Sequence, residues 1–205
     1  MQFEADYSSY ILEFAKIASE YNVELFCIGT ELKNSIEKRP DYWRKLIKEI
    51  QKTYSGKLTY AANWDEYKHI DFWKELDYIG VDAYFPLCNS NCSETEIKRE
   101  WTNISKELSK YSNKFKKPIL FTEFGYPSAN YALSEPWRSD KSIADSTQQL
   151  LAYKSFFASA WNENWLAGIF VWKWYAAPEQ HRISEHDFTP QNKPAINVLK
   201  DAFKP

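Results

Sequence analysis

Short, nearly continuous apolar runs alternate along the chain with longer segments whose apolar residues recur every three or four positions. The first pattern is typical of strands buried on both faces, and the second is typical of one face of a helix. The predicted strands are Val23–Gly29, Lys57–Asn63, Asp77–Phe85, Pro118–Tyr126 and Leu166–Tyr175. The predicted helices are Tyr7–Tyr21, Asp41–Tyr54, Ile70–Leu76, Glu94–Tyr111 and Ile143–Asn162, with a last one opening near Pro194.

Strands that alternate with helices indicate an α/β fold with a parallel sheet. An open doubly wound sheet and a barrel both fit this order. No glycine-rich phosphate turn follows a strand, which disfavours a dinucleotide-binding sheet. Polar and aromatic residues instead collect where the strands end: Glu31, Asn63, Trp64, Tyr84, Glu123, Trp172 and Trp174. In a (β/α)8 TIM barrel these positions surround the mouth, where active sites lie, so the barrel is the predicted fold.

The number of strands predicts an incomplete barrel. A barrel of about 250 residues uses roughly 31 residues per βα unit. Glu31 and Glu123 are 92 residues apart, close to three such units. We therefore expect residues 1–205 to be one partial barrel domain that holds strands four to eight, with the first three βα units, roughly 95 residues, absent before Met1. Its sheet is expected to be open, with Glu31 near one edge, and the chain alone is expected to be insoluble or inactive.

The composition is ordinary except for its aromatic residues, which make up 18% of the chain and include nine Trp and fourteen Tyr. Such side chains offer flat faces with a polar tip, which suits sugar rings as well as a protein core. The net charge of −2, with interspersed signs, argues against a nucleic-acid or anionic-membrane partner. No apolar run is long enough for a membrane span, and no signal peptide is visible, which leaves the compartment undetermined.

The cysteines leave two possibilities open. Cys27 lies in an apolar run and is interpreted as a small buried side chain. Cys88 and Cys92 flank a short polar stretch, where they either close a small disulfide loop or remain free thiols. Neither they nor any histidine nearby completes a zinc site. No metal and no cofactor are expected.

Two glutamates are the candidates for catalysis. Glycoside hydrolysis needs two carboxyl groups beside the scissile bond, one protonated and one ionised. Glu31 in CIGTEL and Glu123 in LFTEFGY each follow an apolar run directly, so both side chains are expected at the barrel mouth. A strand-end glutamate held in a salt bridge is the alternative for either one. For a retaining enzyme the two carboxyl groups are expected about 5–5.5 Å apart.

Five sequence blocks resemble glycoside hydrolase family 113, in the clan of retaining (β/α)8-barrel enzymes. The blocks are FCIGTEL, GKLTYAANWDEY, FWKELDYIGVDAYFPL, KPILFTEFGY and DFTPQNKPA, in this order. The resemblance implies hydrolysis of a β-1,4-mannan-type polysaccharide or oligosaccharide. It also implies that Glu31 is the acid/base after strand four and that Glu123 is the nucleophile after strand seven. Many clan members carry Asn directly before the acid/base, whereas this chain has Thr30.

The remaining candidates support these two carboxylates. Tyr84 is expected to hydrogen-bond the nucleophile and keep it ionised, with a stacked core tyrosine as the alternative. Asn63 and Trp64 are candidates for contacts to a sugar. Trp172 or Trp174 is expected to form the floor under the sugar that is cleaved.

Trp137, in the loop after the fourth predicted strand, is a weaker candidate for substrate binding, and an anchoring role for its loop is the alternative. Two other functions stay open at this point. One is the same mechanism acting on another β-linked hexose polymer. The other is a catalytically silent, truncated fragment that binds sugars.

Overall fold

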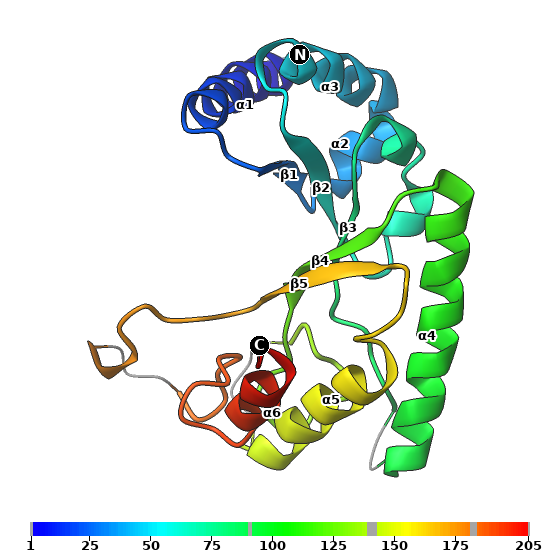
Figure 1. Cartoon of the computed structure of the whole chain (residues 1–205), viewed down its shortest axis with the longest axis vertical. Helices are drawn as coiled ribbons and strands as arrows, with labels where there is room; N and C mark the ends of the chain where they lie inside the picture. Colours follow the sequence, from blue (N-terminus) through cyan, green and yellow to red (C-terminus); the bar gives the residue numbers. More distant parts are fainter. Residues whose placement is uncertain (1, 90–91, 139–142, 181–183, 205) are drawn as a thin grey trace. The chain divides into compact units, whose positions relative to one another are not determined.

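The computed structural model describes residues 2–89, 92–138, 143–180 and 184–204 (Figure 1). The strands are β1 (Leu25–Thr30), β2 (Lys57–Asn63), β3 (Ile79–Asp82), β4 (Ile119–Phe124) and β5 (Leu166–Val171). The helices are α1 (Gln2–Glu20), α2 (Lys33–Lys38), α3 (Pro40–Thr53), α4 (Glu94–Phe115), α5 (Ser146–Ser159) and α6 (Ala195–Ala202). Short 3₁₀ turns are η1 (Tyr67–His69), η2 (Phe72–Glu75) and η3 (Pro178–Gln180).

The strands form one sheet in the order β1-β2-β3-β4-β5, which leaves β1 and β5 at its edges. β1 pairs with β2, and β2 with β3, in parallel. The backbone N–H of Ile79 donates to Pro118, and that of Ala83 donates to Glu123, so β3 and β4 also run in the same direction. This arrangement confirms the predicted α/β fold of an incomplete barrel. Glu31 follows the edge strand β1, and Glu123 lies on β4.

Three predicted strands are too long. β4 covers Ile119–Phe124, inside the predicted Pro118–Tyr126. β3 ends at Asp82 and β5 ends at Val171, so Tyr84, Trp172 and Trp174 lie beyond their strands. One ladder bond still follows each end: Ala83 N–H to the Glu123 carbonyl (2.7 Å) and Trp172 N–H to the Phe124 carbonyl (2.8 Å). The apolar run therefore continues after the regular pairing stops, which is why the hydrophobic pattern alone overestimates the strand length.

The helix predictions differ from the structure at two places. The segment predicted as a helix over Ile70–Leu76 forms η2, with η1 just before it, because the short apolar spacing there supports only single 3₁₀ turns. The helix α2 is not predicted by the pattern, because its six residues bury only Ile36. The other predicted helices are present, with ends shifted by a few residues.

The chain divides into two compact units. The first comprises Met1–Asp82 and Tyr111–Leu120, and the second comprises Ala83–Lys110 and Phe121–Pro205. In the first unit Trp43 of α3 is fully buried and packs edge-on against Tyr60 of β2, with ring centroids 5.5 Å apart. The Tyr7 hydroxyl of α1 donates to the Ile28 carbonyl of β1 (2.8 Å). These contacts hold α1 and α3 against the strands.

The second unit has a core of aromatic rings. Phe124 of β4 and Phe156 of α5 are fully buried, with centroids 4.3 Å apart. Trp101 of α4 packs on the same Phe156 at 5.3 Å. The hydroxyl of buried Tyr126 donates to the Phe85 carbonyl (2.9 Å), which satisfies its polar end inside the core. The contacts of Phe124 and Tyr126 thereby fix the end of β4, where Glu123 lies.

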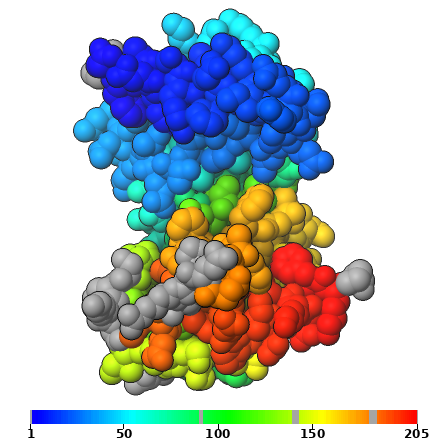
Figure 2. All heavy atoms as spheres, turned by 90° about the vertical axis from the view of Figure 1, so that its left-hand side faces the viewer, coloured from blue at the N-terminus to red at the C-terminus, as the bar shows by residue number. Residues whose placement is uncertain are grey.

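The helix α1 carries an exposed aromatic stripe opposite its buried face. Ile11 and Ala15 are buried, whereas Tyr10 is 57% exposed and Phe14 46%, with their ring centroids 4.9 Å apart. Figure 2 shows this helix (dark blue) as a continuous part of the surface. Even so, among the residues that the structure describes, no helix combines the length and the hydrophobicity needed to cross a membrane.

The exposed stripe predicts opposite effects of substitutions at adjacent positions. The double variant Tyr10→Lys/Phe14→Lys is expected to change the free energy of unfolding by less than about 1 kcal/mol, because both rings face solvent. It is also expected to reduce aggregation, since an exposed apolar patch is removed. The control Ile11→Ala is expected to cost about 2–5 kcal/mol through a core cavity. Denaturant unfolding and light scattering measure both effects, and a double variant as unstable as Ile11→Ala would show that the stripe is packed.

Candidate active site

The carboxylate of Glu123 and the hydroxyl of Tyr84 form a hydrogen bond in the second unit, with Oε2 of Glu123 as the acceptor. The structure brings these two candidates together because the backbone N–H of Ala83 donates to the Glu123 carbonyl (2.7 Å). That bond places the chain after β3 beside the end of β4. The ring of Tyr84 is buried, and Glu123 is half-buried. The pair therefore presents a carboxylate whose orientation is set by a fixed donor.

Two opposing effects act on the Glu123 carboxyl group. Burial raises its pKa above the ordinary value, and the hydrogen bond from Tyr84 lowers it. The net direction is upward. A carboxylate in this setting has less hydration than one in water, and its hydrogen-bond donor favours the ionised form. These are useful properties for a nucleophile or a general base.

Trp172 lies close to the strand that carries Glu123. Its backbone N–H donates to the Phe124 carbonyl (2.8 Å), and its own carbonyl lies directly above Gly125. A Cβ atom at position 125 would be 2.0 Å from that carbonyl oxygen, so only glycine allows the two backbones to approach this closely. The peptide bond between Trp172 and Lys173 is cis. The hydrogen bond to Phe124 and the close approach to Gly125 place the Trp172 backbone beside β4.

The tryptophan candidates of this unit are all partly open to solvent. Trp172 is 44% exposed, Trp174 is 55% exposed and Trp137 is 47% exposed. The first two follow β5, and Trp137 lies in the loop between β4 and α5. All three residues are therefore exposed to solvent, and solvent access is a prerequisite for stacking on a sugar.

Glu31, the other candidate carboxylate, lies in the first unit and follows β1 directly. Its backbone is in the left-handed region, with φ of 51°, which is uncommon for a residue other than glycine. The backbone N–H of Glu31 donates to the Ala61 carbonyl (2.9 Å), and the next N–H, of Leu32, donates to the Tyr60 hydroxyl (2.6 Å). Two hydrogen bonds to β2 thus hold Glu31 in a conformation that is costly for a residue other than glycine.

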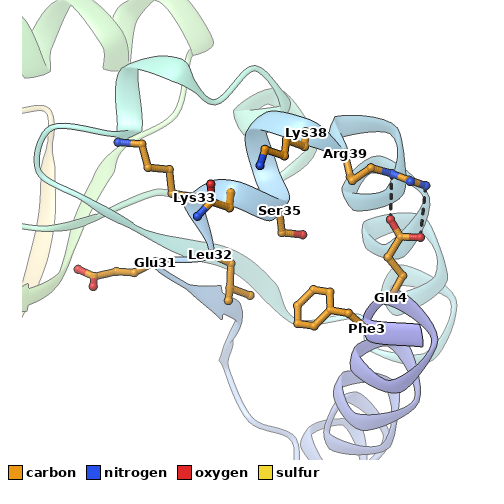
Figure 3. A pocket seen from close by; sticks show the side chains of 9 residues that line it. Phe3, Glu4, Glu31, Leu32, Lys33, Ser35, Lys38 and Arg39 are labelled. Carbon is orange, nitrogen blue, oxygen red and sulfur yellow. Dashed lines mark hydrogen bonds and ion pairs between the residues drawn. The ribbon is translucent and has the colours of Figure 1, made fainter. Parts of the chain in front are cut away.

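A pocket of about 450 Å³ opens beside Glu31. Its lining residues are Phe3, Glu4, Glu31, Leu32, Lys33, Asn34, Ser35, Lys38 and Arg39. Figure 3 shows the Glu31 carboxylate pointing away from the ion pair between Glu4 and Arg39, which lies at the other side of the pocket (2.9 Å). The Glu31 side chain is exposed. Its carboxylate is therefore accessible to a ligand.

Asn63 and Trp64 end β2 in the same unit. The side-chain oxygen of Asn63 accepts the backbone N–H of Trp64 (2.8 Å), which fixes the turn after the strand. In the sheet register Asn63 lies opposite Asp82, the last residue of β3. Asn63 and Trp64 are partly buried, so each retains some accessible surface.

Two acidic residues beside the candidates were given no role from the sequence: Asp82, and Asp187 of the block DFTPQNKPA. Asp82 is fully buried at the end of β3, and its negative charge adds to burial in raising the pKa of the Cys27 thiol. Asp187 lies between β5 and α6, where it bonds to residues beside Trp174. In the sequence, Asp82 could have been noticed as an acidic residue inside an apolar run. Asp187 could have been noticed in the polar segment DFTPQ.

Cys88 and Cys92 form a disulfide, which is one of the two possibilities that the sequence left open. Within the described ranges there is no group of three or more His, Cys, Asp or Glu side chains arranged to hold a metal ion.

A parallel sheet of consecutive βα units with acidic and aromatic residues at its strand ends defines the (β/α)8-barrel class. The model of Glycoside Hydrolase Family 113 matches residues 2–193. The chain therefore belongs to this family. A search among curated proteins gave no significant match.

Solved structures of this family resemble the chain along nearly its whole length. A GH113 β-mannanase from Alicyclobacillus acidocaldarius in complex with ManMIm is 26% identical, with a TM-score of 0.83 over 98% of this chain. A GH113 β-1,4-mannanase is likewise 26% identical, with a TM-score of 0.82 over 97% of this chain. In both cases the chain spans 62% of the length of the matched protein. A β-D-glucuronidase from Dictyoglomus thermophilum, 18% identical with a TM-score of 0.69, shares the fold.

The hydrogen bond between Tyr84 and Glu123 predicts a shift in the pH dependence of activity. Tyr84→Phe removes the donor that lowers the pKa of Glu123, so this pKa is expected to rise further. If Glu123 acts as an ionised nucleophile, the acidic limb of the kcat/KM profile is expected to move to higher pH. The control is Tyr153→Phe, a buried tyrosine of α5 whose hydroxyl has no hydrogen-bond partner within the described part of the chain. An unchanged acidic limb in Tyr84→Phe would contradict the assignment.

Proposed function

We propose that the protein is a retaining glycoside hydrolase that cleaves β-1,4-linked mannan-type polysaccharides through a covalent glycosyl-enzyme intermediate. The match of residues 2–193 to Glycoside Hydrolase Family 113 is the observation that carries this proposal. The similarity to solved β-mannanases supports the choice of substrate class. Because the chain spans 62% of those proteins, the activity is proposed for the whole protein that contains it.

In this mechanism Glu123 is the nucleophile. Its half-buried carboxylate attacks the anomeric carbon, and the hydrogen bond from Tyr84 favours its ionised form. Partial burial supports this role, because a carboxylate with less hydration is a stronger nucleophile. The pair lies at the end of β4, on a backbone held by the buried ring of Phe124. A rigid base of this kind favours a defined direction of attack.

Glu31 is the acid/base residue. It protonates the leaving oxygen in the first step and removes a proton from water in the second. Its backbone is left-handed, and the backbone N–H groups of residues 31 and 32 donate hydrogen bonds to β2. Both features support a fixed direction for its side chain. The expected separation of the two carboxyl groups is about 5–5.5 Å, the distance for retention of configuration.

The aromatic candidates are assigned to sugar binding. Trp172 or Trp174 forms the floor under the sugar that is cleaved, and Asn63 and Trp64 contact its hydroxyl groups or the neighbouring sugar. Trp137 is a more distant candidate on its loop. The exposed faces of these rings support this role, because the apolar face of a pyranose stacks on an aromatic ring.

Substitution of each carboxylate distinguishes the two roles. Glu31→Ala is expected to retain turnover of substrates with an activated leaving group, which need little protonation, and azide is expected to restore its rate and to give a β-glycosyl azide. Glu123→Ala is expected to lose turnover by a factor of about 10⁴ or more, because the covalent intermediate no longer forms. Any azide product of this variant is expected to be the α-anomer. Chemical analysis of the azides by NMR is the measurement.

The control for these variants is Glu37→Ala, an exposed glutamate of α2 that is expected to have wild-type activity. A β-glycosyl azide from Glu123→Ala would show that the two roles are reversed. Release of reducing sugar from mannan but not from β-glucan supports the substrate class, and the opposite preference would replace mannan by another hexose polymer. No hydrolysis of either by the whole protein would overturn the proposed function.

A further inference from the structure

The segment Asp187–Gln191, named here the anchor segment, contacts the candidate site although the mechanism above gives it no role. It lies between β5 and α6 in the second unit. Its Asp187 side chain binds Lys173 and Tyr175, the neighbours of Trp174 in the sequence. Its Phe188 ring packs on Tyr84. The segment therefore touches both the proposed sugar floor and the partner of the proposed nucleophile.

The Asp187 carboxylate joins the two residues that flank Trp174. Its Oδ2 accepts the hydroxyl of Tyr175 (3.1 Å) and forms an ion pair with Nζ of Lys173 (3.3 Å). Its Oδ1 accepts the backbone N–H of Thr189 (2.8 Å), which fixes the carboxylate itself. The side chain is only 12% exposed, so these contacts are shielded from water and are stronger than surface ones.

The Gln191 amide holds the backbone next to Trp174. Its Oε1 accepts the N–H of Tyr175 (2.7 Å), and its Nε2 donates to the Tyr175 carbonyl (2.9 Å). The hydroxyl of Thr189 donates to the same Oε1 (2.9 Å), and Gln191 is buried. The amide thus pairs with both backbone polar groups of Tyr175, as a neighbouring strand would in a sheet. The chain after β5 thus remains ordered after its strand has ended.

The anchor segment also packs against the Tyr84 ring. Phe188 meets it edge-on, with centroids 5.9 Å apart and an interplanar angle of 79°. The Phe188 carbonyl accepts Nε2 of buried Gln149 in α5 (3.0 Å), which holds the segment against the core. The position of Tyr84, and through it the hydrogen bond to Glu123, therefore shares a support with the tryptophan floor.

The exposure along residues 172–175 shows why such a support is needed. Trp172 and Trp174 are exposed, whereas Lys173 and Tyr175 are partly buried by their contacts with the anchor segment. An exposed ring has few packing contacts of its own to restrict its orientation. Holding the backbone and both neighbours lowers the entropy that a ligand must remove on binding.

We propose that Asp187 and Gln191 are positioning residues that hold Trp174 as a preformed flat face for a pyranose ring of the substrate. This inference rests on the proposed function, because it assigns the face to a sugar. It goes further in naming the residues that orient the face. It also predicts that losing them weakens sugar binding more than it slows the chemical step.

The test combines kinetics with a measurement that does not need activity. In the whole protein, Asp187→Ala and Gln191→Leu are expected to raise KM for a manno-oligosaccharide about tenfold while kcat changes less than about twofold, since binding common to ground and transition state is lost. With 5-fluorotryptophan incorporated, the ¹⁹F resonance of Trp174, assigned with Trp174→Phe, is expected to shift and broaden in both variants. Glu185→Gln, an exposed carboxylate two residues before Asp187, is the matched control and is expected to change neither.

Milder variants keep the test decisive if Asp187→Ala does not fold. Tyr175→Phe removes one hydrogen bond to Asp187, and Asp187→Asn retains its shape without its charge, so both are expected to give intermediate changes in KM and in the resonance. An unchanged Trp174 resonance and KM in folded variants would overturn the inference. A loss of thermal stability and kcat without a change in KM would also overturn it, because it indicates a purely structural role. Absence of hydrolysis by the unaltered protein contradicts the proposed function alone, since the ¹⁹F measurement still reports on the positioning.

Discussion

The parallel ladder of strands is the constraint on which the rest of the structure depends. Parallel pairing requires each strand to run in the same direction, so the residues that follow the strands emerge at the same edge of the sheet. The chain must return between successive strands, and α3, α4 and α5 lie in three of these connections. Within each compact unit the candidates lie at or just after the ends of their strands: Glu31, Asn63 and Trp64 in the first unit, and Tyr84, Glu123, Trp172 and Trp174 in the second.

Near the ends of the strands, the ladder gives way to individually placed hydrogen bonds. Ala83 and Trp172 each make a single bond to β4 after their own strands have ended, and these bonds place Tyr84 and the first tryptophan beside the strand of Glu123. Gly125 allows the close backbone approach. The buried aromatic core below, with Phe124 and Phe156 in contact, supplies the rigidity that these few polar contacts require.

The two carboxylates lie in surroundings of different kinds. Glu123 is half-buried and has a neutral donor beside it, and burial is the largest influence on its pKa. Glu31 is exposed, beside an open pocket, with a strained backbone that its neighbours in β2 maintain. An acid/base residue must exchange protons with water during the second step of a retaining mechanism, and a nucleophile must not be screened by water. Of the two carboxyl groups, Glu123 is therefore the one whose protonation depends on its protein surroundings, with the hydrogen bond from Tyr84 opposing the effect of burial.

The sequence by itself determined the order of the elements, the parallel sheet, the partial barrel and the family, because strand and helix periodicities and the five blocks around the strands are local properties. β2 was predicted to the residue, and Glu31 and Glu123 stood out because each directly follows an apolar run. Only the tertiary structure decided where β3 and β5 end, that Cys88 and Cys92 pair, and that Asp187 and Gln191 hold the chain around Trp174. Those features depend on contacts between residues distant in sequence, and the polarity of DFTPQ alone does not reveal which partner each side chain reaches.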